Sequence, residues 1–78
     1  MQEKYIFLEC VSYVNKENKT INLACVYITN GKSCDILKIS VDKDTKEFLQ
    51  QYEYQDITHL IVVEYDIFNK RYVTKINI

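Results

Sequence analysis

Proline and glycine, the residues that most often shape turns, are almost missing from this chain of 78 residues. It has no proline and one glycine, although most of it reads as strand. Its turns must therefore use Asn, Asp, Lys and Ser, which tolerate tight backbone geometry less well than glycine. Without edge prolines, its strand edges need another form of protection, and closure of the sheet into a barrel is one such form.

Long hydrophobic runs are also missing. No run approaches the roughly 20 apolar residues that cross a bilayer as a helix, and the apolar stretch near the N-terminus is interrupted by Glu9 and has no small-residue cleavage site. We therefore expect no membrane segment, no signal peptide and a cytoplasmic protein. The length fits a single domain over residues 1–78, and 47% hydrophobic with 27% charged residues is typical of a globular chain.

Cysteine is scarce and odd in number. Cys10, Cys25 and Cys34 show no CxxC spacing, which favours small buried hydrophobes in a reducing cytoplasm. A zinc site made with His59, the single histidine, would lack a ligand pair close in sequence. We expect no metal and no cofactor.

Catalytic motifs are missing as well. His59 lies inside an apolar strand-like run, which is typical of a structural histidine. Glu64 and Asp66 straddle the end of that run without a partner for acid–base chemistry. Gly31 stands alone, so no glycine-rich loop can hold a phosphate. We expect a protein that is not an enzyme.

One stretch reads as helix, residues 42–53. Asp44 followed three residues later by Glu47 resembles a capping box, with Asp42 as the alternative cap. Its spacing gives one apolar face, which consists of Phe48, Leu49 and Tyr52. A helix this short must pack on something apolar to be stable.

Five extended runs surround that helix, three before it and two after. They cover residues 5–14, 21–29, 34–41, 57–65 and 71–78. In the first run, alternation predicts one face made of Ile6, Leu8, Cys10 and Val14, and another made of Tyr5, Phe7, Glu9 and Tyr13. The centre of the fourth run, residues 60–63, is apolar throughout, which predicts burial on both faces.

The Asn30–Gly31 pair between the second and third runs predicts a tight hairpin. A two-residue loop would place Thr29 opposite Lys32. One face of this hairpin then forms an inner surface of Ala24, Val26, Ile28, Leu37 and Ile39. The other face carries Leu23, Cys25, Tyr27, Cys34, Ile36 and Lys38. It is too apolar for ordinary solvent-facing sheet, so we expect a barrel wall, a second subunit or a ligand to cover it.

The order β-β-β-α-β-β predicts an all-β protein with one helix, built as a five-stranded OB-like barrel. In topology and length the whole chain resembles the compact single-domain OB-fold proteins that bind single-stranded nucleic acid in phages and mobile elements. That resemblance implies binding through the face of the second and third strands and the first and last loops. The residues implied are Lys16, Lys19, Tyr27, Lys32, Lys38, Phe68, Lys70 and Arg71.

Charge is sorted along the chain. Residues 15–38 hold four lysines against two acids, and residues 66–78 hold three basic residues against one acid. Residues 42–56 hold five acids against two lysines. Basic residues near aromatic ones suit the stacking of unpaired bases.

Two classes of function stay open. One is binding of single-stranded nucleic acid. The other is a protein-binding module, either a homodimeric accessory subunit or an inhibitor that a mobile element directs at a host enzyme. Salt separates them, because nucleic-acid affinity falls steeply as salt rises while an apolar protein interface responds little.

Overall fold

The computed structural model describes residues 3–65 and 71–78 of the chain. Its strands and α-helix follow in the order β1 (Lys4–Val14), β2 (Thr20–Thr29), β3 (Cys34–Val41), α1 (Lys43–Leu49), β4 (Ile61–Tyr65) and β5 (Arg71–Ile76). β1, β2 and β3 form one antiparallel sheet, and β4 and β5 form a separate antiparallel ribbon. The order of strands and helix agrees with the sequence prediction, but their assembly does not.

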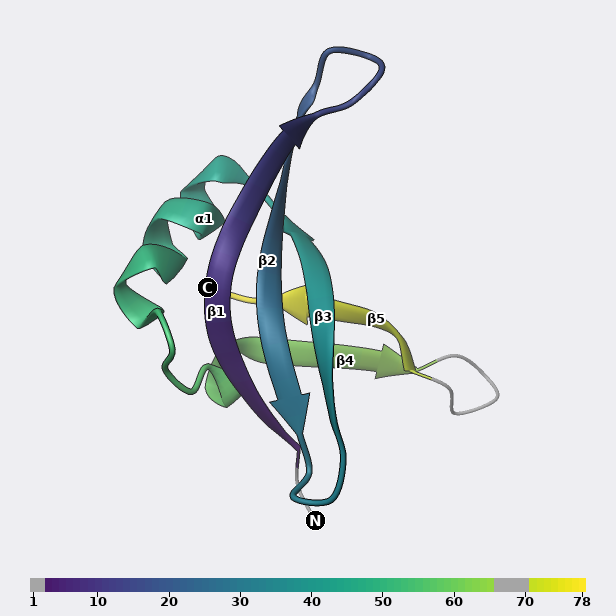
Figure 1. Ribbon diagram of the computed structural model, residues 1–78, viewed down its shortest axis with the longest axis vertical. Coiled ribbons are helices and arrows are strands. Elements are labelled where there is room, and N and C mark those ends of the chain that lie inside the picture. Colours follow the sequence, from purple (N-terminus) through teal and green to yellow (C-terminus); the bar gives the residue numbers. More distant parts are fainter. Residues whose placement is uncertain (1–2, 66–70) are drawn as a thin grey trace.

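The predicted five-stranded OB-like barrel is wrong. Within the described residues, backbone ladders join β1 to β2, β2 to β3, and β4 to β5, and they do not close a ring. Figure 1 shows β4 and β5 crossing behind the three-stranded sheet at a steep angle. β4 cannot continue along β1 because Thr58–Leu60, where the sequence predicts strand, forms a 3₁₀ helix (η2).

A β-bulge interrupts β1. The pairing with β2 passes from Phe7 opposite Val26 to Glu9 opposite Cys25, so Leu8 is an extra residue. A bulge reverses the alternation of side chains beyond it. The predicted face assignment for this strand is therefore wrong. Before the bulge Tyr5 and Phe7 face the core, and beyond it Cys10 takes their side.

The β2–β3 turn is longer than the predicted two-residue loop. Thr29 pairs with Cys34, which leaves residues 30–33 in the turn. The side-chain Oδ1 of Asn30 accepts hydrogen bonds from the backbone N–H groups of Lys32 at 2.9 Å and Ser33 at 3.0 Å. Gly31 has a φ of 90°, which favours glycine. The register shifts by two residues, so each residue keeps its predicted face.

Helix α1 is shorter than predicted and is followed by a 3₁₀ helix, η1 (Gln50–Tyr52). Asp42 is the N-cap, since its side chain accepts a hydrogen bond from the Thr45 N–H at 2.7 Å. Of the two predicted caps, Asp42 is therefore the correct one, and Asp44 with Glu47 does not form the capping box. Of the predicted apolar face, Leu49 is fully buried and Tyr52 packs partly buried on the core. Phe48 is half-buried, with its ring 5.3 Å from that of Tyr52.

Asp42 and Asp56 each accept a hydrogen bond from a backbone N–H group, and this makes the stability of the fold depend on acidic pH. Hydrogen bonds from Thr45 lower the pKa of Asp42, and hydrogen bonds from Thr58 lower the pKa of Asp56, both from the ordinary value of 3.8. Since the unfolded chain then binds protons more readily, this stabilisation is complete above pH 3.8 and is lost as the pH falls through the folded values.

We expect the urea midpoint to hold steady at mildly acidic pH and to fall below about pH 4. Asp42→Asn keeps a capping side chain without its charge, so its midpoint should fall less steeply. Asp44→Asn, which removes a charge from the same turn but no capping bond, should follow the parent. Identical profiles for the parent and Asp42→Asn would contradict the assigned cap.

The free edge of β1 is covered near its start. Residues 54–57 run alongside it, with the Phe7 N–H donating to the Gln55 carbonyl at 3.0 Å and the Ile57 N–H donating to the Tyr5 carbonyl at 2.7 Å. This segment protects the edge of β1 near its start, the role expected of barrel closure.

The core lies between the inner face of the sheet, the helix and the β4–β5 ribbon. Its buried residues are Tyr5, Phe7, Ala24, Val26, Ile28, Ile39, Leu49 and Ile57. The inner surface predicted for β2 and β3 is confirmed, with Leu37 partly buried beside it. β4 alternates instead of being buried on both faces, since Val63 packs on the core and Val62 is exposed.

Candidate binding surface

The face of β1–β3 turned away from the core is apolar, and no described element covers it. The sequence predicts its β2–β3 part. Side chains reach it from alternate positions of each strand. In cross-strand rows it carries Ile6, Tyr27 and Ile36, then Glu9, Cys25 and Lys38, then Val11, Leu23 and Ser40, with Tyr13 and Ile21 beyond. We call this set the outer face.

Large apolar side chains of the outer face reach solvent. Ile36 is 55% exposed, Tyr13 52% and Val11 37%. Helix α1 and the β4–β5 ribbon lie on the other side of the sheet, and no described element covers this one (Figure 1). Exposed apolar side chains gathered on one face are a feature that interaction surfaces share. Of the apolar residues predicted for the β2–β3 part of this face, Ile36 is exposed, Leu23 and Tyr27 are half-buried and Cys25 is buried. The barrel wall expected to cover it is not formed by the described residues.

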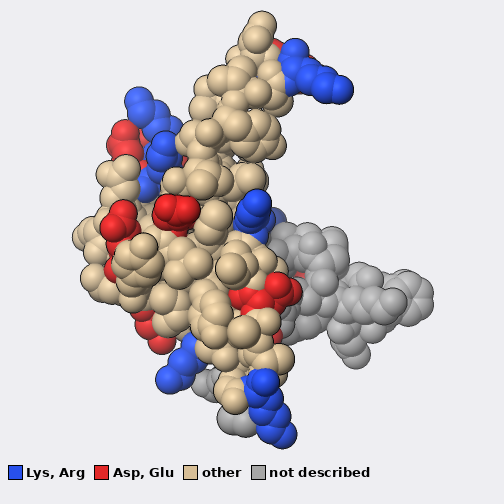
Figure 2. All heavy atoms as spheres, viewed as in Figure 1, with Lys and Arg blue, Asp and Glu red and all other residues tan. Residues whose placement is uncertain are grey.

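Charge is sparse on this face. Figure 2, drawn in the same view, shows mostly uncharged atoms over the sheet, with isolated acidic and basic groups. Glu9 and Lys38 are both exposed and stand at opposite ends of one row, on either side of Cys25. Lys4 follows near the start of β1. The face is thus mostly apolar, with Glu9 and Lys38 in one row and Lys4 at its end.

Tyr27 adds a polar hydroxyl group to the outer face, on the central strand β2. A side-chain hydrogen bond with Cys34 raises the pKa of the Tyr27 phenol. Cys34 is exposed and Cys10 half-buried, so the prediction of three buried cysteines holds fully for Cys25 alone. Burial raises the pKa of the Cys10 thiol, which keeps that side chain in its neutral form.

The lysines expected to bind nucleic acid do not gather in one place. Lys16 and Lys19 lie in the β1–β2 turn and Lys32 in the β2–β3 turn, at opposite ends of β2. A strand of ten residues holds these turns roughly 30 Å apart. Lys19 also lies 3.7 Å from the carboxylate of Glu17, which partly neutralises its charge.

The remaining predicted site residues divide between the sheet and the last loop. Lys38 and Tyr27 both lie on the outer face, in adjacent rows. Phe68 and Lys70 lie outside the described residues, as does the side chain of Arg71. The structure therefore brings together Tyr27 and Lys38 from the predicted set.

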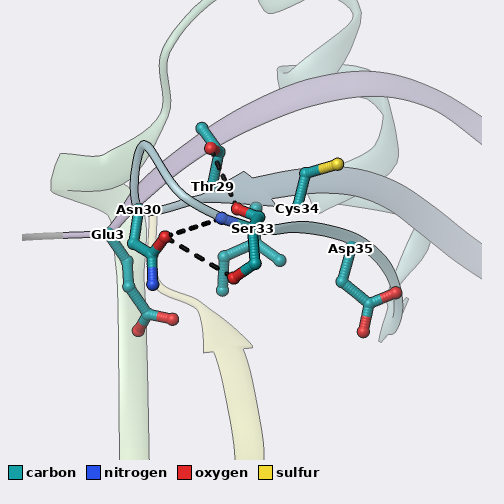
Figure 3. A pocket seen from close by; sticks show the side chains of 7 residues that line it. Glu3, Thr29, Asn30, Ser33, Cys34 and Asp35 are labelled. Atoms are coloured by element: carbon teal, nitrogen blue, oxygen red, sulfur yellow. Dashed lines mark hydrogen bonds between the residues drawn. The ribbon is translucent and has the colours of Figure 1, made fainter.

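A small hollow lies beside the β2–β3 turn. It measures about 230 Å³, and its wall includes Thr29, Asn30 and Ser33. Figure 3 shows the carboxylates of Glu3 and Asp35 on opposite sides of it, so they do not converge on one ion. The polar groups of Thr29, Asn30 and Ser33 between them make hydrogen bonds within the turn. The shape of the hollow therefore follows from the turn itself.

A second, open groove of about 560 Å³ lies where α1 begins. Its lysines are Lys43 and Lys46, and the Lys46 Nζ donates to the Ser12 Oγ at 2.8 Å. Asp42 adds a carboxylate that caps the helix. The sequence gives no local signal for this groove, because the groove depends on how α1 packs against the end of the sheet.

Groups for catalysis or metal binding do not converge in the described part of the chain. No cluster of three or more His, Cys, Asp or Glu side chains is close enough there to hold a metal ion. His59 is exposed in η2, with its ring 6.4 Å from that of Tyr52, whereas the sequence predicts a histidine inside a strand. Over the same residues, no helix has the length and apolar character needed to span a bilayer.

Comparison with known proteins gave no match to a family model, to a curated protein or to a solved structure. The fold defines the chain as a small β protein in which one α-helix and a two-stranded ribbon back a three-stranded sheet. Since no relative supplies a function, function is inferred from the surfaces of the molecule.

Proposed function

We propose that this chain is a non-catalytic protein-binding domain that contacts its partner through the outer face. The observation that carries the proposal is the solvent exposure of Val11, Tyr13 and Ile36 on one continuous face. Burial of apolar surface is the main driving force of protein association, so such a face gains most from another apolar protein surface.

The composition of the face favours a protein over a nucleic acid. Phosphate binding needs several basic groups along one track. On the outer face Lys38 is accompanied by Glu9 in its row, Lys4 lies at the start of β1, and the turn lysines lie at the two far ends of the sheet. Aliphatic side chains such as Val11 and Ile36 fit a protein interface, and they offer no flat surface for base stacking.

Binding of single-stranded nucleic acid is the second candidate, supported by one observation. Tyr27 and Lys38 lie in adjacent rows of the same face, which pairs an aromatic ring with a cation. If this function holds, binding to a poly-dT oligomer should raise the light-scattering mass and should be lost steeply as salt rises.

Photo-crosslinking tests the protein-binding proposal. A photoreactive benzoylphenylalanine replaces Tyr13 on β1 or Ile36 on β3, both exposed on the outer face, in the full chain expressed in its own cells. The control position is Glu47, exposed on α1. We expect discrete protein adducts from positions 13 and 36 and none from position 47.

Two results would contradict the proposal. Adducts that disappear on nuclease treatment would identify nucleic acid as the partner of this face. Equal yields at positions 13, 36 and 47, or none at positions 13 and 36, would show that the outer face binds no partner selectively.

A further inference from the structure

We propose that the partner of the outer face is a second copy of this chain, packed face to face about a two-fold axis parallel to β2. This inference rests on the proposed function and names the protein that occupies the same surface. It follows from the arrangement of charge and apolar groups in the cross-strand rows.

The charged row is self-complementary. Glu9 on β1, Cys25 on β2 and Lys38 on β3 lie side by side. Strands lie about 4.8 Å apart, so Glu9 and Lys38 are roughly 10 Å from each other and do not pair within one copy. A two-fold rotation about an axis above Cys25 and along β2 places Glu9 of each copy opposite Lys38 of the other. Two ion pairs then flank the axis.

The neighbouring rows are apolar and match under the same rotation. On one side, Ile6 lies opposite Ile36 of the other copy, and Tyr27 lies opposite its own equivalent. On the other side, Leu23 meets its equivalent near the axis, next to Val11. The rotation therefore buries the exposed Ile36 and Val11 side chains. Lys4, in the row at the start of β1, is exposed and faces Cys34 of the other copy at the end of the face.

Charge also favours a two-fold axis parallel to β2 over one perpendicular to β2. A two-fold axis perpendicular to β2 would place Glu9 opposite Glu9 and Lys38 opposite Lys38, and like charges facing each other are unfavourable. With the axis along β2, the two sheets pack with their strands aligned, about 10 Å apart. At that separation two Cys25 residues on the axis are too far apart for a disulfide, so the dimer does not depend on oxidation.

The size of the face predicts a weak dimer. Strand β1 has 11 residues, and at about 3.3 Å per residue and three strands of about 4.8 Å the face covers roughly 500 Å² per copy. Both copies together bury about 1,000 Å², near the lower limit for a specific interface. The dimer should therefore dissociate on dilution into the micromolar range.

Sedimentation equilibrium of the full chain, from micromolar to millimolar concentration, tests this arrangement. We expect a monomer–dimer equilibrium. Glu9→Lys and Lys38→Glu should each weaken it about tenfold, since each reverses both ion pairs. The double variant should regain the parent affinity to within about threefold. Ile36→Lys should weaken association at least about tenfold, because it buries a charge. Glu47→Lys, with the same charge change on α1, should match the parent.

Three other outcomes would contradict the inference. A parent chain that stays monomeric at every concentration excludes the second copy as partner. The crosslinks from positions 13 and 36 then decide separately whether the outer face binds another protein. A dimer that Ile36→Lys disrupts but the double charge reversal fails to restore contradicts the two-fold axis. A dimer that tolerates every substitution on the face uses another surface, and this overturns both the inference and its geometry. Urea unfolding of each variant confirms that it is folded.

Discussion

Phe7→Ala should lower the free energy of unfolding by about 3–5 kcal/mol. Phe7 is 1% exposed and packs against the centre of the core. Its backbone N–H and carbonyl bond to residues 54 and 55, and the substitution keeps those bonds while removing the ring. A cavity remains because the surrounding strands can relax only in part. A domain of this size has roughly 4–12 kcal/mol of stability, so the loss is a large share of the whole.

Chemical denaturation with urea measures this effect, and Tyr13→Ala is the matched control. Tyr13 lies on the same strand but on the outer face, 52% exposed. Its removal should cost less than about 1 kcal/mol in the monomer. Equal losses for Phe7 and Tyr13 would contradict the bulge that turns these two side chains to opposite faces.

Leu49→Ala should destabilise the protein by about 2–5 kcal/mol. Leu49 is fully buried at the end of α1, and the other buried residue of that helix is the smaller Thr45. A seven-residue helix is not stable alone, so its docking depends on these side chains. The melting temperature should fall by roughly 8 °C or more.

Gln50→Ala is the control for Leu49, since Gln50 follows it directly and is exposed. Its melting temperature should stay within about 2 °C of the parent. A Leu49→Ala variant as stable as Gln50→Ala would mean that α1 does not pack on the sheet.

The inner face of the sheet could be predicted from the sequence because alternation survives an error in register. The predicted and observed β2–β3 pairings differ by two residues, and a shift of two leaves each side chain on its own face. Val26 and Ile39 are thus correctly placed in the core, although the turn that connects their strands is four residues long.

The bulge in β1 could not be predicted from the residues around it. Leu8 is the extra residue, and no glycine marks the position. The bulge lies where residues 54–57 pair with the edge of β1, more than 40 residues later in the chain, so it depends on long-range packing. Because the bulge reverses the alternation, the assignment of Cys10 and Glu9 to their faces had to come from the structure.

The barrel prediction is wrong because the apolar run at residues 57–65 is not one continuous strand. The run from Ile57 to Tyr65 contains η2 at its start. Asp56 accepts a hydrogen bond from the Thr58 N–H at 2.8 Å, the pattern of an Asx turn. That Asp-x-Thr sequence was the local signal that the chain turns before β4.

The dispersal of the expected basic site could have been foreseen. In an antiparallel sheet, consecutive hairpin turns lie at opposite ends of the strand they share. Lys19 and Lys32 flank β2 in this way. The β2–β3 part of the outer face, by contrast, was recognisable from alternation, whereas its β1 residues Val11 and Tyr13 reach this face only because of the bulge. The exposed apolar side chains of both parts are the basis of the proposed function.

The most direct test of a protein partner for the outer face is the photo-crosslinking yield at positions 13 and 36, compared with the yield at position 47, in living cells. If the outer face binds a protein, positions 13 and 36 give discrete protein adducts that resist nuclease, and position 47 on α1 gives none. The same yield at all three positions, or adducts that nuclease removes, would contradict the assignment of this face to a protein partner.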